Sequence, residues 1–174
     1  KDINQKGFGF FVSHSNEGIV RGTGLLVSAN GDNLSSDILS PQIASYYSLN
    51  KGNSKQSYPS SQMGSIALLR QSFYDFQYYT KSDLNFTDLS MEAWKSQMHL
   101  PRFFQTADKL EILRASKIAN EFNSSFIYLG SGNEYEAIDP LKKLNSKIVV
   151  PINFPDAYDV SDPYIFRLIP LSQL

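Results

Sequence analysis

The last third of the chain alternates short apolar stretches with helix-like stretches, and this alternation restricts the fold more than any other feature. The apolar stretches are typical of buried strands because they are short and are bounded by turn residues. They cover 102–106, 126–130 and 147–154, and the helix-like stretches cover 108–122 and 134–145. Strand–helix–strand–helix–strand predicts parallel strands joined by right-handed crossovers, either in a barrel or in an open sheet.

Both helix-like stretches begin with residues that cap helices. Asp108 and Glu111 match a D-x-x-E capping box, and Asn133 with Glu136 forms a second pair at the same spacing. We therefore expect helices to begin directly after Asp108 and after Asn133.

The first hundred residues predict a different organisation. Residues 8–14 and 19–29 alternate apolar runs with Gly and Asn, so we expect extended segments there. The serine-rich stretch 35–48 and the polar stretch 48–61 are interpreted as cap and loop chemistry.

Two further helices are expected before residue 100. Apolar residues three and four apart predict one at about 61–80, with Ser60 as its N-cap. The other covers 88–97 and carries the single tryptophan. Tyrosines spread around the first helix at 72–79, which predicts contact with more of a longer chain or with a second copy.

The length of 174 residues suits a single domain with a sizeable core. We divide it into extended segments (1–47), a loop with helices (48–100) and a βαβαβ part (101–174). Both ends break off within apparent structure, so we expect a fragment of a longer protein. The near-neutral charge of −1 argues against nucleic acid and membrane surfaces as partners. No apolar run is long enough to predict a membrane span.

The glycine-flanked turn Gly130-Ser131-Gly132 is a candidate functional feature with three interpretations. Free N–H groups at a helix start can bind a phosphate, as in an open-sheet nucleotide-binding protein. The turn lacks the third glycine and the acidic residue of a dinucleotide fingerprint, and no Walker lysine follows it. Ordinary turn chemistry explains it equally well, and a third interpretation depends on the resemblance described below.

Metal ligands are scarce in the sequence. Zinc sites use three or four nitrogen, sulfur or oxygen ligands, whereas this chain has no cysteine and only His14 and His99. The acidic segment 156–164 resembles a weak cation loop, although turn formation between its prolines accounts for it as well.

The stretch NKGNSKQSYPSSQMGSIALLRQSFYDFQYY (50–79) resembles bacterial amidohydrolase-superfamily proteins related to imidazolonepropionases. GIVRGTGLLV (18–27) and the segment 122–164 are similar to further stretches of the same proteins, so the resemblance spans nearly the whole chain. It implies an α/β fold made of the parallel βα units of a partial TIM-barrel-like domain, preceded by an extended or hairpin segment. It also implies a bacterial protein and favours a periplasmic or secreted location, while a cytoplasmic location stays open.

The same resemblance implies metal-dependent hydrolysis of C–N bonds by zinc or iron in a longer parent protein. Its metal ligands would be a His-x-His on the first strand, histidines or a modified lysine on middle strands, and an aspartate on the last strand. This sequence has no His-x-His, and Gln105 stands where relatives carry a histidine. Gly130 and Ser131 stand where the next strand of the relatives would present another histidine. The Gly130-Ser131-Gly132 turn would then occupy the position of a metal ligand that this chain lacks.

We therefore expect a segment that is inactive alone, has no catalytic residue or cofactor of its own, and lines a pocket for a small-molecule or peptide-like substrate. The expected pocket residues are His14, Gln105, Thr106, Ser131, Asn133 and Asn153. The alternative function is a non-catalytic binding or scaffolding domain of barrel ancestry. Under either function, the expected partner of the chain is the rest of its parent protein or another copy.

Overall fold

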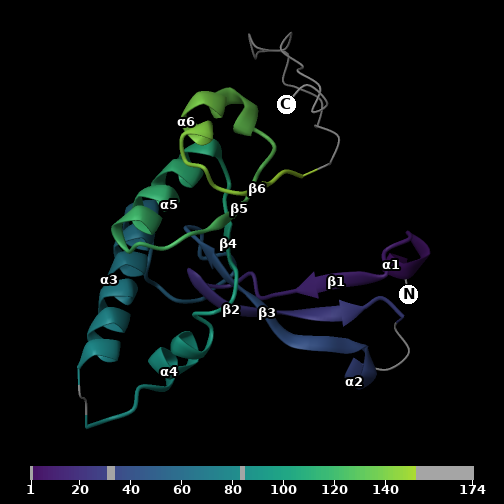
Figure 1. Cartoon of the computed structure of the whole chain (residues 1–174), viewed down its shortest axis with the longest axis horizontal. Coiled ribbons are helices and arrows are strands. Elements are labelled where there is room, and N and C mark those ends of the chain that lie inside the picture. The colour runs from purple at the N-terminus through teal and green to yellow at the C-terminus, as the bar shows by residue number, and fades with distance from the viewer. Residues whose placement is uncertain (1, 31–33, 83–84, 152–174) are drawn as a thin grey trace.

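The computed structural model describes residues 2–30, 34–82 and 85–151, and in this part a single sheet runs through the molecule (Figure 1). The six strands lie in chain order from β1 to β6. They are β1 (Phe10–Ser13), β2 (Val20–Ser28), β3 (Ile38–Ser48), β4 (Arg102–Gln105), β5 (Ile127–Leu129) and β6 (Ile148–Val149). The first two pairings are antiparallel, and those from β3 to β6 are parallel. The parallel pairing predicted for the last three strands is confirmed.

The larger helices lie on one side of this sheet (Figure 1). The helical elements are α1 (Asp2–Gln5), α2 (Leu34–Asp37), α3 (Gln62–Lys81), α4 (Leu89–Ser96), α5 (Lys109–Glu121), the 3₁₀ turn η1 (Glu134–Ala137) and α6 (Ile138–Lys142). Tyr47, Phe104 and Tyr128 come from three adjacent parallel strands and are buried in one core with Leu69 and Ile112. Alternate strand residues therefore form the core with the helices, as the two-residue period of a strand requires.

On the opposite face of the sheet, stacked aromatic rings take the place of the helices. Tyr46 and Phe103 alternate with the core residues, and their rings stack with centroids 5.5 Å apart. His14, after β1, stacks on Tyr46 at 3.9 Å. The sheet is curled into a half-barrel, which is consistent with a partial barrel-like fold.

The sequence-based interpretation of 35–48 as loop was wrong, because this segment contains the longest strand. Its last five residues, from Ala44, are buried without alternation, since β3 lies between two neighbouring strands and beneath helices. Pro41 also weakens the strand signal, because proline cannot donate to a ladder. The ladder with β2 is irregular on this part of β3.

The helix starts also differ from the expected ones in part. Ser61 rather than Ser60 caps α3, accepting a hydrogen bond from the Gly64 amide. Asp108 caps α5 as expected. Asn133 makes no side-chain cap, and the helix expected from 134 is divided into η1 and α6. Pro140 explains the division, because its missing N–H is tolerated only in a first helical turn.

Within the described ranges, no helix has both the length and the apolar character needed to cross a membrane.

Candidate functional site

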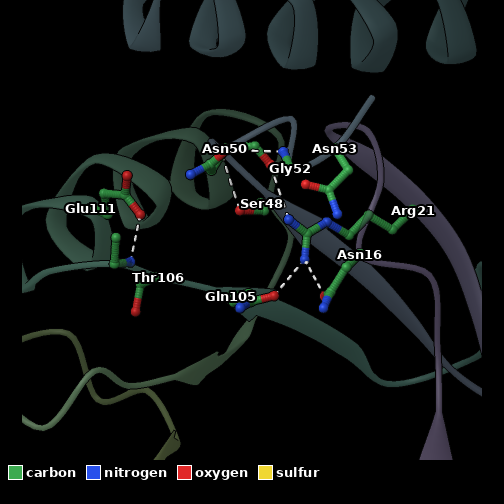
Figure 2. Close-up of a pocket in the computed structure, with 10 residues that line it drawn as sticks. Asn16, Arg21, Ser48, Asn50, Gly52, Asn53, Gln105, Thr106 and Glu111 are labelled. Atoms are coloured by element: carbon green, nitrogen blue, oxygen red, sulfur yellow. Dashed lines mark hydrogen bonds between the residues drawn. The ribbon is translucent and has the colours of Figure 1, made fainter. Parts of the chain in front are cut away.

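A polar cavity of about 240 Å³ lies where β3 and β4 end (Figure 2). Ligand sites of parallel α/β folds lie at this carboxyl edge of the strands. One side is formed by Asn16, Arg21, Ser48, Asn50, Gly52 and Asn53, and the other by Gln105, Thr106, Ala107 and Glu111. The cavity is therefore built from strand ends and from loops that are distant in sequence.

Arg21 is the central charged group of this cavity and is only 9% exposed. Its Nε donates to the Gly18 carbonyl (3.1 Å) and its Nη2 to the Asn50 carbonyl (3.0 Å). Its Nη1 donates to Asn16 Oδ1 and to Gln105 Oε1 (Figure 2). These acceptors are all neutral, and burial lowers the pKa of Arg21. A guanidinium stays protonated despite such a shift, so a positive charge is held at the end of β4.

A bulge in β2 places Arg21 there. Val20 pairs with Tyr47 and Thr23 with Ser45, so β2 has one more residue than β3 over this stretch. Gly22 lies inside the bulge with φ +76°, a conformation that glycine adopts readily. Bulges turn the side chains next to them, and here Arg21 is buried beside exposed Val20.

The loop after β3 forms the wall next to Arg21. The Asn50 amide donates to Ser48 Oγ, and the Gly52 amide donates to Asn50 Oδ1. Gly52 has φ +59°, and a Cβ atom on it would lie 2.0 Å from the backbone oxygen of Asn16. Only glycine lets this loop approach the β1–β2 connection so closely.

Glu111 supplies a carboxylate to the other wall. It is buried in the first turn of α5, where Oε1 accepts from Gln62 Nε2 and Oε2 from the Ala107 amide, both at 2.7 Å. The capping box is thus confirmed in part, since Glu111 bonds to Ala107 instead of to the cap residue itself. Arg21 and Glu111 line the same cavity. The ion pairs found within the described residues do not include one between these two side chains.

The Gly130-Ser131-Gly132 turn is occupied by a side chain of the same chain. Glu134 accepts hydrogen bonds from the Ser131 amide through Oε1 and from the Gly132 amide (2.8 Å) through Oε2. A Cβ on Gly130 would lie 2.7 Å from Glu134 Oε1, so glycine makes room for this contact. The N–H groups that a phosphate would need already have a partner.

Two of the six expected pocket residues lie together in the cavity. Gln105 and Thr106 line it, and Thr106 Oγ1 also donates to the Leu129 carbonyl at 2.8 Å. His14, Ser131 and Asn133 are not among the residues lining this cavity, and Asn153 and the acidic segment 156–164 lie outside the described residues.

Sequence reasoning missed Arg21. The available signal was one arginine beside Gly22 in an otherwise apolar strand. In the described ranges, no three His, Cys, Asp or Glu side chains form a group that could hold a metal ion.

The chain overlays on the crystal structure of an amidohydrolase from Thermotoga maritima MSB8 with a TM-score of 0.70 and 18% identity. This is a distant amidohydrolase-like fold. The overlay covers 84% of the present chain and 43% of that amidohydrolase, so this chain spans less than half of its length. No family model and no curated protein matches the sequence.

Proposed function

We propose that this amidohydrolase-like chain is a segment of a longer protein that hydrolyses C–N bonds in small molecules, and that it supplies one wall of the substrate cavity. The supporting observation is the polar cavity at the ends of β3 and β4, on the edge where ligands of parallel α/β folds bind. The resemblance to imidazolonepropionase-related proteins favours the same edge as the substrate site, because it implies that the metal ligands of the longer protein lie at strand ends.

The residues at this edge do not fit a divalent metal. Glu111 is the one carboxylate among the residues that line the cavity, and its two oxygens already accept hydrogen bonds from Gln62 and Ala107. Ser48 and Gln105 offer only neutral oxygen atoms, and Gln105 Oε1 already accepts a hydrogen bond from Arg21. A fixed guanidinium beside a ligand atom repels a cation. The proposed segment therefore holds no metal and turns over no substrate alone, and any metal-activated water depends on other residues of the longer protein.

A non-catalytic binding domain of barrel ancestry is the second candidate. The buried guanidinium of Arg21 favours it, since a permanent cation can hold a ligand without any metal. Both candidate functions place a small molecule in the cavity, and they differ only in whether the longer protein hydrolyses it.

The test uses the longer protein and the 174-residue chain side by side. Hydrolysis of small amides and lactams by the zinc-loaded longer protein would support the enzyme, and ligand binding without turnover would support the binding domain. After dialysis against zinc, the 174-residue chain should retain less than one tightly bound equivalent by elemental analysis. One tightly held zinc per 174-residue chain, or amide hydrolysis by it, would contradict the proposal.

A further inference from the structure

We propose that a second cavity, between α6 and β6, binds an amphiphilic monoanion such as a medium-chain fatty acid. The apolar chain of the ligand would lie in the cavity, and its carboxylate would lie at Lys142 and Lys147. This α6–β6 cavity shares no lining residue with the polar cavity at the ends of β3 and β4. The inference therefore goes beyond the proposed function and concerns a separate site.

The α6–β6 cavity has the size of a small-molecule site. Its volume is about 520 Å³, and ligand pockets usually span about 300–1,000 Å³. It lies at one edge of the described sheet, where β6 is the last strand and pairs with β5. α6 lies at the same end of the sheet (Figure 1). The residues of η1, of α6 and of the segment that leads into β6 form the whole lining.

Much of this lining is apolar. Tyr135, Ile138 and Leu141 contribute from η1 and α6, and Ile148 contributes from β6. Leu141 is buried in the core, whereas Ile138 and Ile148 are half-buried. An alkyl chain that covered the half-buried side chains would bind favourably, because apolar surface of both partners would leave water.

Two lysines give the cavity a surplus of positive charge. Lys142 and Lys147 line it and are exposed, and the ion pairs found within the described residues include neither of them. Glu134 is the single acidic residue of the lining, and its two oxygens accept hydrogen bonds from the Ser131 and Gly132 amides. Two positive charges and one negative charge leave a surplus of one, which matches a ligand with a single negative charge.

The apolar lining and the surplus charge together select the class of ligand. A neutral apolar molecule would leave the lysine charges without a partner, and a cation would be repelled by them. A carboxylate at the end of an alkyl chain satisfies both features, because the charge stays at the exposed lysines while the chain is buried. Exposed ion pairs are weak, so most of the affinity should come from the chain.

Octanoate has this chemistry and is the probe for the test. The 174-residue chain is titrated with octanoate at about pH 7 while its backbone amide signals are followed by NMR. Saturable shifts are expected at Ile138, Leu141 and Ile148, without shifts at Gly52 and Gln105. Butanoate should bind at least about tenfold more weakly, because its chain buries four fewer methylene groups. Octan-1-ol should bind about threefold more weakly, because it carries no charge.

Two double variants separate the charge of the cavity from the charge of the whole surface. Lys142→Gln combined with Lys147→Gln should lower the affinity for octanoate about threefold, to that for octan-1-ol. The matched control combines Lys117→Gln with Lys143→Gln, which removes the same charge from exposed lysines outside the lining. The control should keep the preference for octanoate over octan-1-ol. The comparison of octanoate with butanoate needs no variant, so it decides the question even if a variant does not fold.

The absence of a saturable shift with octanoate would overturn the inference and would mean that another part of the protein fills the cavity. Equal affinities for octanoate and butanoate would also overturn it, as would an unchanged preference for octanoate after both lining lysines are replaced. Shifts at Gly52 and Gln105 alone would overturn it by placing the ligand at the ends of β3 and β4. Because the titration involves neither metal nor turnover, failure of the hydrolase proposal in the longer protein would be seen separately.

Discussion

The Glu134→Gln substitution tests whether the Gly130-Ser131-Gly132 turn is filled by its own chain. Glu134 is buried and accepts from two backbone amides, Ser131 and Gly132. Glutamine keeps the shape and one acceptor oxygen but turns an NH₂ group toward the other amide. Hydrogen bonds to a charged group contribute about 1.5–3 kcal/mol, so we expect the free energy of unfolding to fall by about that amount.

The expected loss is large enough to measure. A change of 1 kcal/mol shifts the unfolding temperature by roughly 2–4 °C for a chain of this size, so Glu134→Gln should lower it by about 3–12 °C. Thermal and urea unfolding followed by circular dichroism provide the measurement. Glu17→Gln is the matched control, because the same change at an exposed site should alter stability by less than about 0.5 kcal/mol.

Two results would refute this reasoning. One is a Glu134→Gln variant as stable as Glu17→Gln, which would show that the carboxylate contributes nothing in the turn. The other is stabilisation of the unmodified chain by inorganic phosphate with shifts at the Ser131 and Gly132 amides. That result would mean that an external anion displaces Glu134.

Two further predictions concern the core and the cavity. Burial raises the pKa of Tyr128 to about 12, above its ordinary value near 10, so the folded chain keeps a proton that the unfolded chain releases. The contribution of Tyr128 to stability should therefore be constant below about pH 10 and be lost as the pH rises toward 12. Urea unfolding of Tyr128→Phe should show a smaller fall in stability over this range, and an equal fall would contradict this assignment. Gly52→Ala should lower the free energy of unfolding, measured in urea, by more than about 2 kcal/mol, because its Cβ would meet the Asn16 backbone. Gly7→Ala is the control, since Gly7 also has positive φ but open space around it, and equal losses in the two variants would show that the Asn16 contact is unimportant.

Local patterns predicted the part of the fold that local chemistry determines. The three parallel strands after residue 101 and the cap at Asp108 could be predicted because each depends on a few adjacent residues. β3 could not, since its buried half has no alternation and its serines resemble loop residues. Burial on both faces, which depends on neighbouring strands and helices, removes the pattern on which strand prediction relies.

The candidate site was predictable only at its strand ends. Gln105 ends a short strand and Thr106 follows it, so their place at the carboxyl edge could be predicted from the sequence order. Arg21 reaches Gln105 across 84 positions, through a bulge and a loop contact that no local pattern encodes. The hydrogen bonds from the turn amides to Glu134 could not be predicted either. A carboxylate near a helix start is also expected from the helix dipole alone, so its presence does not reveal these bonds.

The charge of Arg21 decides what kind of chemistry the end of β4 can support. A divalent ion about 4 Å from a guanidinium is repelled by roughly 8 kcal/mol at an effective dielectric constant near 20. Ser48 and Gln105 add only neutral oxygens and Glu111 is the single carboxylate that lines the cavity, whereas zinc sites of proteins combine three or four charged or imidazole ligands. If the proposed longer protein holds a metal, we therefore expect it to lie farther from Gln105, unless Arg21 leaves its four acceptors when the metal binds. The second route breaks the contacts that hold the Asn16 and Asn50 segments together, so metal loading there would disrupt the cavity wall. An anion would need no such rearrangement, because the positive charge of Arg21 attracts it.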